Sequence, residues 1–415
     1  MDIMKESGRC EALAVEHRRH LHRHPELSGL EYKTLKYIDE RLTEYGVDHY
    51  EVENGGILGF IGTGPEDNTL LLRADIDALP IRENPRNLKR EREVISETDG
   101  VQHACGHDAH TAILLAAAKI LKERETDLSK GRVLLLFERG EEGNGNLRYL
   151  IRHIREHDIK VSAAHGLHVR ADLPVGKMIA RSGPVMAGAA GFQVTLRGRG
   201  GHGSRPDLAN SPVDCFNALY SALSSIRLRC VSPFDGLTFS IGYLKGGDKG
   251  NIIPSELAFG GSARFYKKEI GVRFAEEFRS ILDGVTAAYR CSYDIAGLKP
   301  GIPTVNNDDA IAFAREGIVS HLGADVLAEG EPLMGSESFS ILAAQYPSAF
   351  LFLGVKNDEY GSGADLHSEY FDLDEAALKI GIAETVAFAL EYVKRAPRFR
   401  QQTPYQAELL QWLER

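Results

Sequence analysis

Several features of membrane, secreted and nucleic-acid-binding proteins are missing from this sequence. No apolar run approaches the roughly 18 residues that a transmembrane helix needs. Residues 1–8 lack the hydrophobic segment of a secretory signal, so we expect a cytoplasmic protein without membrane contact. The formal net charge is −10, which makes binding to nucleic acid or to an anionic membrane unfavourable.

Cysteine and tryptophan are also scarce, with five cysteines and one tryptophan. The cysteines at positions 10, 105, 215, 230 and 291 are odd in number and widely spaced, which does not fit a disulfide framework. Apolar residues make up 43% and charged residues 26%, as is ordinary for a globular protein. A chain of 415 residues is long enough for a sizeable core, and its length predicts about two or three domains.

The first part of the chain has the pattern of an α/β domain. Apolar residues recur at helical spacing through residues 1–45 and Pro25 interrupts them, which predicts two helices. Short apolar runs predict buried strands at 57–61, 70–72 and 133–137. Residues 111–124 predict an amphipathic helix between the last two strands. Strands that alternate with helices indicate a mostly parallel sheet.

The pattern changes between residues 192 and 296. Alternating apolar residues predict strands at 192–196, 237–243, 257–265 and 291–295. Helical spacing predicts one helix from residue 212 and another over 274–285. The order β-α-β-β-α-β is typical of a ferredoxin-like unit. Residues 300–415 return to a mixed α/β pattern that closes with a helix at 376–392. We therefore predict one α/β domain, residues 1–187 and 299–415, interrupted by an inserted domain at 188–298.

The densest group of chemically active side chains is the stretch H-A-C-G-H-D-A-H at 103–110. In extended backbone Cys105 and His107 point to the same side, and Gly106 lets the chain turn closely around an ion. Thiolate and imidazole are good ligands for divalent metals. A buried cysteine beside helix-capping groups would give the same pattern, so this stretch alone leaves both interpretations open.

Two adjacent carboxylates, Glu141 and Glu142, follow the strand predicted at 133–137. They cannot both face one metal ion without distortion. A division of roles is more plausible, in which one ligates the metal and the other holds or deprotonates a metal-bound water. A solvated acidic turn is the alternative.

Histidines follow or end two further apolar segments, in H-G-L-H-V at 165–169 and in L-H-S-E-Y-F at 366–371. Surface histidine explains each motif taken alone. Four groups of metal-ligand side chains at strand ends are harder to explain by chance. Because open α/β sheets carry their sites at the carboxyl ends of their strands, the four groups together predict one metal-dependent site.

Taken together, these motifs resemble the peptidase M20 family. The branch they resemble is the amidohydrolase branch, which hydrolyses N-acyl amino acids, hippurate and auxin conjugates. Besides the motifs above, the resemblance rests on L-R-A-D-I-D-A-L-P at 72–80 and H-L-H-R-H-P-E-L-S at 20–28. It covers nearly the whole chain in the expected order. It implies a two-metal, exopeptidase-like catalytic domain and an inserted ferredoxin-like lid through which such proteins often form homodimers.

The resemblance also implies a set of site residues. The implied metal ligands are Cys105, His107, Glu142, His168 and His367. Glu141 is the implied general base that activates a metal-bound water. Asp75 matches an aspartate that orients a metal-ligand histidine in related branches, and a purely structural role for Asp75 and Asp77 is the alternative. Two divalent ions per subunit are implied. Mn2+ is expected because the family most often uses it, and Zn2+ and Co2+ are the alternatives.

Three residues of the inserted segment are implied to contact the substrate. His202 matches a histidine that reaches an active site, often that of the partner subunit, and helps to polarise the tetrahedral intermediate. Asn251 lies in N-I-I-P, where the family has N-V-I-P. Arg264 matches an arginine that would hold a substrate carboxylate, and its alternative is a charge at a strand edge.

The chain departs from the family pattern at three places. The family's Q-P-A-E-E is E-R-G-E-E at 138–142, and its S-E-D-F is S-E-S-F at 336–339. Asp207 replaces the last histidine of the family's H-x-x-P-H. None of these changes removes an implied ligand or the implied base.

We therefore expect a metal-dependent amidohydrolase that cleaves the amide bond of N-acyl amino acids or related small conjugates. A dipeptidase of the same superfamily is the first alternative. A catalytically inactive metal-binding homologue is the second, and the retention of Glu141 together with all five implied ligands argues against it.

Overall fold

The computed structural model describes residues 2–143, 145–400 and 405. The described residues form two compact units. The first unit takes in the described parts of Met1–Gly183, Val305–Gly330 and Ile341–Arg415. The second takes in Pro184–Thr304 and Glu331–Ser340. Across the described ranges no helix is both long and apolar enough to cross a membrane.

A seven-stranded sheet forms the centre of the first unit, in the order β1-β2-β4-β3-β5-β15-β6. Its strands are β1 (Asp48–Val52), β2 (Gly56–Ile61), β3 (Thr69–Asp75), β4 (Arg132–Glu138), β5 (Ala163–Pro174), β6 (Met178–Ile179) and β15 (Ser348–Lys356). The central strands β4, β3, β5 and β15 run parallel, and β1, β2 and β6 extend the sheet in antiparallel pairing. β3 is buried along its whole length, as expected for the middle of a parallel sheet covered on both faces.

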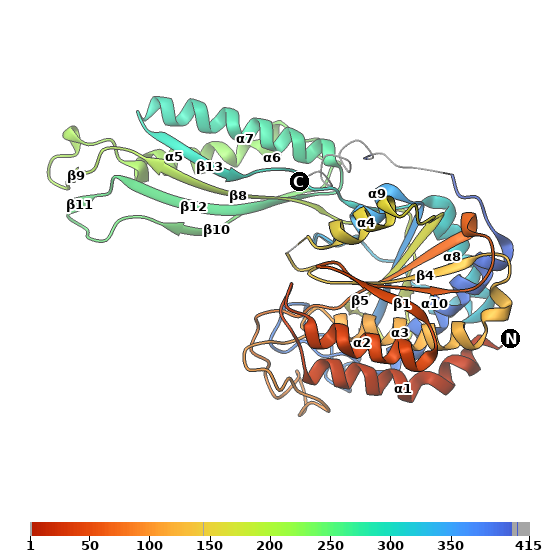
Figure 1. The fold of residues 1–415 in the computed structure, drawn as a ribbon. Helices are drawn as coiled ribbons and strands as arrows, with labels where there is room; N and C mark the ends of the chain where they lie inside the picture. Colours follow the sequence, from red (N-terminus) through yellow and green to blue (C-terminus); the bar gives the residue numbers. More distant parts are fainter. Residues whose placement is uncertain (1, 144, 401–404, 406–415) are drawn as a thin grey trace. The chain divides into compact units, whose positions relative to one another are not determined.

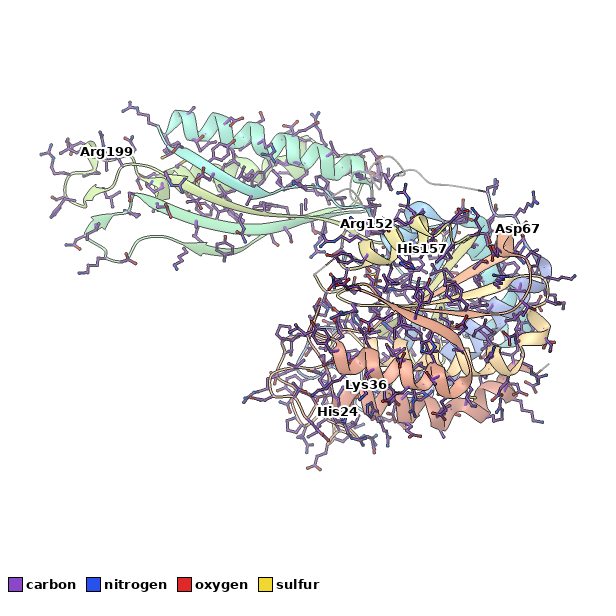
Figure 2. All side chains as sticks on the ribbon, in the orientation of Figure 1. His24, Lys36, Asp67, Arg152, His157 and Arg199 are labelled. Atoms are coloured by element: carbon purple, nitrogen blue, oxygen red, sulfur yellow. The ribbon has the colours of Figure 1, made fainter. Side chains whose placement is uncertain are left out.

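Helices cover this sheet on both faces. They are α1 (Ile3–Arg23), α2 (Tyr32–Tyr45), α3 (His107–Glu123), α4 (Leu147–Glu156), α8 (Asp308–His321), α9 (Ser340–Gln345) and α10 (Ala376–Arg395). α1 packs against α3 and α10, and Figure 1 shows α1, α2 and α3 on the face opposite α4. α2 buries Leu35, Ile38 and Leu42, whereas the side chain of Lys36 is 77% exposed (Figure 2). The two helices predicted within residues 1–45 are confirmed.

The second unit is a four-stranded antiparallel sheet with helices on one face (Figure 1). In chain order its main elements are β8 (Gly188–Arg197), α5 (Pro212–Leu223), α6 (Ser225–Arg229), β10 (Leu237–Lys245), β12 (Glu256–Phe265), α7 (Lys268–Ala288) and β13 (Ser292–Gly297). The sheet order β10-β12-β8-β13 is that of a ferredoxin-like fold. Four short strands form two further pairs: β9 (Gly201–His202) with β11 (Ile252–Ile253), and β7 (Gly183–Met186) with β14 (Thr304–Asn306).

The register of the parallel strands brings the predicted motifs to one edge of the first unit's sheet. Asp75, the last residue of β3, lies opposite Glu138, the last residue of β4. On the other side of β3 the last paired residues are Arg73 and Gly166, so His168 lies two residues beyond that pairing on β5, as Asp75 does on β3. α3 begins at His107. The chain therefore delivers residues 75–77, 105–107, 139–142 and 168 to the same region.

Candidate metal centre

The turn that carries Cys105 and His107 depends on the glycine between them. Gly106 has φ +82° and precedes the first residue of α3. A Cβ at this position would lie 2.4 Å from the Cγ2 atom of Val169, so a side chain is excluded by space as well as by backbone conformation. The turn leaves both Cys105 and His107 buried.

Two histidines in this region present the same ring nitrogen for ligation. His107 donates from Nδ1 to Oδ1 of Asp77 over 3.1 Å, and its buried Nε2 has no hydrogen-bond partner. His168 donates from Nδ1 to the backbone oxygen of Val169 over 2.7 Å. Because each Nδ1 has an acceptor behind it, the neutral form of each ring carries its proton there and its lone pair on Nε2. This tautomer, fixed by a partner behind the ring, is the one that a metal-ligand histidine needs.

Glu142 and His367 form the other side of the centre. Oε1 of Glu142 lies 3.2 Å from Nε2 of His367, and the backbone N–H of Glu142 donates to Oδ2 of Asp77 over 2.9 Å. His367 has φ +63°, a conformation held by its own N–H, which donates to the backbone oxygen of Ala104. Asp77 therefore supports both His107 and the Glu142 backbone.

The donor atoms gather into overlapping sets. Ligand atoms lie within 4.8 Å of one another in three sets: Cys105, His107 and His168; Cys105, Glu142 and His367; and His107, Glu141 and Glu142. Cys105 belongs to the first two sets. The buried Nε2 of His107 has no hydrogen bond but lies 3.9 Å from Oε1 of Glu142, an arrangement that suits donors around a shared cation. Thiolate, imidazole and carboxylate around a shared sulfur suit two borderline divalent cations.

Burial controls the protonation of these groups. It raises the pKa of the Cys105 thiol well above its ordinary value, and a bound divalent cation would offset this by stabilising the thiolate. Burial also lowers the pKa of His168 to about 3, so that ring is neutral and able to ligate at neutral pH. At Glu142 burial acts against ionisation, but the neighbouring His367 and His107 rings outweigh it and lower the pKa.

A fourth cluster, Asp75 with His107 and His110, is a hydrogen-bonded support and not a ligand set. His110 donates from Nδ1 to Asp75 over 2.6 Å, and its Nε2 accepts the backbone N–H of Val169 over 2.9 Å, so both ring nitrogens are used. Asp75 also accepts from Arg73. The expectation that Asp75 orients a ligand histidine is therefore corrected: Asp77 contacts Nδ1 of His107, and Asp75 holds His110.

The N-terminal histidine tract, which contributed to the family resemblance but not to the implied site residues, contains one buried supporting residue. His22 is bonded through Nδ1 to Asp108 and through Nε2 to Glu83, over 2.8 and 2.7 Å. Asp108 directly follows His107 and also accepts from the buried Arg18. By contrast, the His24 side chain lies at the surface and is 42% exposed (Figure 2). The spacing of one helical turn between Arg18 and His22 was the available signal, since both lie on the buried side of α1.

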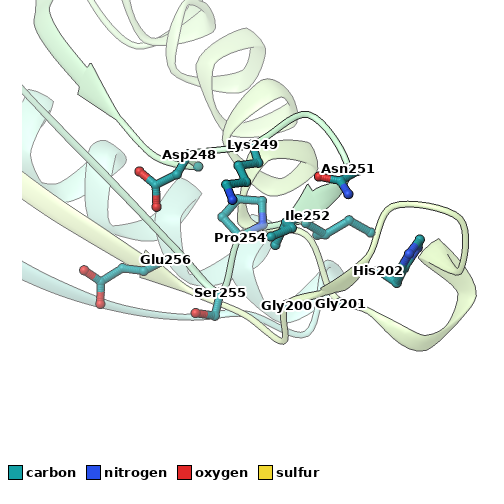
Figure 3. A pocket seen from close by; sticks show the side chains of 12 residues that line it. Gly200, Gly201, His202, Asp248, Lys249, Asn251, Ile252, Pro254, Ser255 and Glu256 are labelled. Atoms are coloured by element: carbon teal, nitrogen blue, oxygen red, sulfur yellow. The ribbon is translucent and has the colours of Figure 1, made fainter.

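The three predicted substrate-contacting residues lie in the second unit. His202 on β9 pairs with Ile252 on β11, and the N–H of Gly203 donates to the backbone oxygen of Asn251. His202 and Asn251 thus lie on neighbouring segments and line the same cavity of about 760 Å³ (Figure 3). Arg264 is separate from this cavity lining, and its Nη1 donates to Oγ of Ser336 over 2.7 Å. The structure therefore brings His202 and Asn251 together.

Residues 71–391 match the model of peptidase family M20/M25/M40. This chain belongs to that family. Among its relatives, the IAA-amino acid hydrolase ILR1-like 2 of Arabidopsis thaliana is 34% identical over 92% of this chain and 85% of its own length. The N-acetylcysteine deacetylase of Bacillus subtilis (strain 168) is 32% identical over 92% of this chain and 97% of its own.

A solved structure supports the same assignment. The YXEP protein of Bacillus subtilis, described as a dinuclear metal binding peptidase of the M20 family, superposes with a TM-score of 0.75 at 28% identity. The match covers 92% of this chain and 97% of that one. The mixed α/β fold predicted for this M20 member is confirmed, as is the predicted family.

Proposed function

We propose that this M20 member is a metal-dependent amidohydrolase that cleaves the amide bond of an N-acyl amino acid or a related small conjugate. One observation carries the proposal: two sets of donor atoms share Cys105, and Glu141 lies in a third set with His107 and Glu142. A pair of divalent cations bound there supplies Lewis-acid polarisation of the scissile carbonyl and of the attacking water. The names of the relatives in Arabidopsis and Bacillus agree with a small acylated amino acid as substrate.

In this proposal Cys105, His107, Glu142, His168 and His367 hold the cations. Glu141 is the general base. It takes a proton from the attacking water as the new C–O bond forms, and returns a proton to the nitrogen as the C–N bond breaks. A carboxylate that is adjacent in sequence to a ligand and lies in one donor set with His107 and Glu142 suits this role. The products are a carboxylic acid and an amino acid.

The inserted segment 188–298, which lies within the second unit, is proposed to complete the site as a lid and dimerisation domain. His202 would stabilise the tetrahedral intermediate as a hydrogen-bond donor, with Asn251 beside it, and Arg264 would pair with a substrate carboxylate. The outer edge of β10 supports a homodimer, because Tyr243 and Leu244 on this edge strand are 45% and 54% exposed. Mn2+ is the proposed metal, with Zn2+ or Co2+ as alternatives.

Peptide cleavage is the competing activity. A further relative, thermostable carboxypeptidase 1 of Saccharolobus solfataricus, is 32% identical over 91% of this chain and 95% of its own length. A substrate panel decides between the two: N-acetyl, N-benzoyl and indoleacetyl amino acids against dipeptides, with release of free amino acid as the readout. We expect chelator-sensitive turnover of the N-acyl compounds. Faster turnover of dipeptides would favour the peptidase, and no turnover by metal-loaded protein would favour an inactive homologue.

A further inference from the structure

The loop that carries Glu141 is tied at two points to buried carboxylates. On one side the backbone N–H of Gly140 donates to Oε1 of Glu31 over 2.8 Å. On the other side the N–H of Glu142 donates to Oδ2 of Asp77 over 2.9 Å. Glu31 and Asp77 are 0% and 1% exposed. Glu141 lies between these two anchors, so its backbone position depends on both.

Glu31 is itself held in place by the residue that starts this loop. Arg139 donates from Nε to Oε2 of Glu31 over 2.9 Å and from Nη2 to the backbone oxygen of Gly29 over 2.8 Å. The N–H of Gly29 in turn donates to Oε1 of Glu31 over 2.7 Å. One carboxylate therefore joins the turn before α2 to the loop after β4 through bonds to Gly29, Arg139 and Gly140.

The local sequence gives the loop little stiffness of its own. Gly140 has φ +66°, and Gly143 and Gly145 also have positive φ. Where the family pattern has proline, which restricts φ, this chain has Arg139. An isolated buried ion pair adds little net stability, because desolvation of both charges opposes their attraction. The carboxylate of the buried Glu31–Arg139 pair also accepts the N–H of Gly140 in the loop. The role of this pair is therefore better explained by the loop conformation that it fixes than by stability.

We propose that Glu31 and Arg139 are positioning residues, which fix the loop after β4 so that Glu141 is placed for proton transfer. The inference rests on the proposed function in taking Glu141 as the general base. Within the described residues Glu31 and Arg139 are not members of the donor sets, so their replacement should misplace the base without removing a cation ligand. The effect should therefore fall on kcat, with KM and metal content preserved.

The direct test is Glu31→Gln, which keeps the side-chain shape but removes the charge and one acceptor. We expect kcat per metal-loaded subunit to fall roughly 10- to 100-fold, the range for a small displacement of a catalytic group. KM and two ions per subunit should be retained. Glu384→Gln is the matched control, because Glu384 is a buried carboxylate paired with His165 over 3.0 Å that has no bond to the loop. It should lower thermal stability and leave kcat per loaded subunit unchanged.

Arg139→Lys tests the same proposal with a milder change, and it replaces Glu31→Gln as the test if that variant does not fold. One ammonium group cannot reproduce the guanidinium's geometry toward both Glu31 and Gly29, so a smaller fall in kcat is expected at unchanged KM. A wild-type kcat per loaded subunit in either folded variant would overturn the inference, as would an equal fall in the Glu384→Gln control. Full activity of Glu141→Gln would instead overturn the proposed function, so the two failures are distinguishable.

Discussion

The Nε2 atom of His168 lies 3.5 Å from the Sγ atom of Cys105, although 63 residues separate them in the chain. Parallel pairing of β3 and β5 and the turn at Gly106 produce this approach. Both groups are buried, and a thiol and a neutral imidazole at this distance gain little from each other without a cation. Both residues belong to one donor set with His107, so metal occupancy is the first quantity to measure.

Cys105→Ser should lower metal occupancy, because Cys105 belongs to two of the donor sets and a hydroxyl is a much weaker ligand than a thiolate. Glu142→Gln should do so as well, since it replaces a charged oxygen ligand. Elemental analysis after dialysis measures both. Cys230→Ser is the control, because Cys230 lies outside all of the donor sets and should leave the metal content intact. Full occupancy in both Cys105→Ser and Glu142→Gln would show that the ligand set is wrong.

Glu141→Gln should keep the fold and the metal but lose turnover. The amide preserves the shape of the side chain and removes the proton acceptor, and general base catalysis is worth roughly 10²–10⁴-fold. Steady-state kcat on the best N-acyl substrate, with metal content measured on the same sample, checks this. The exposed Glu53→Gln serves as the control for the same chemical change. Near-normal turnover of Glu141→Gln would remove Glu141 from the mechanism.

His202→Ala should lower kcat by roughly 10²–10³-fold without changing metal content, because it removes a donor that acts most strongly in the transition state. Its place of action can be tested by mixing it with Glu141→Gln protein. If His202 acts on the partner's site, a mixed dimer has one site with both defects and one with neither, and activity returns. If it acts within its own chain, each site keeps one defect and mixing restores nothing. A fully active monomer by sedimentation would contradict the dimer proposal.

His22→Gln should make the protein less stable in a pH-dependent way. Burial and Arg18 act against protonation of His22, but its bonds to Asp108 and Glu83 outweigh them and raise its pKa above the ordinary value. Protonated His22 therefore contributes its full stabilisation of the folded state below pH 6.5, roughly the pKa of histidine in the unfolded chain. This stabilisation is lost as the pH rises through the higher pKa of His22 in the folded protein. We expect a loss of about 1–3 kcal/mol at pH 6 that becomes smaller toward pH 9.

Thermal unfolding of wild type and His22→Gln at several pH values measures this difference. Besides Arg18, Asp108 and Glu83, the neutral ring of His103 lies nearby, at 6.5 Å between ring centroids. His24→Gln is the matched control, because His24 follows the same helix and is exposed. Its Tm should stay close to wild type throughout. A gap between wild type and His22→Gln that widens with rising pH would contradict the assigned charge state.

The sequence by itself determined the alternation of strands and helices, the β-α-β-β-α-β order of the middle segment and the family. These follow from local patterns. Apolar periodicity indicates which face of a helix or strand is buried. The family motifs are also local, because their metal-ligand residue types stand close together at 103–110 and at Glu141-Glu142. The extension of the helix predicted at 111–124 back to His107 was missed, because the helix starts directly after Gly106, whose left-handed conformation is not readable from a local pattern.

Only the tertiary structure decided which residues support the site. The sequence resemblance gave the orienting role to Asp75, whereas the structure places Asp77 against His107 and Asp75 against His110. The burial of His22 and the bond from Glu31 to the loop at Gly140 likewise join segments that are remote in sequence. Such long-range contacts form when the layers of the fold pack together. A local sequence pattern cannot predict them, because it contains only one of the two partners.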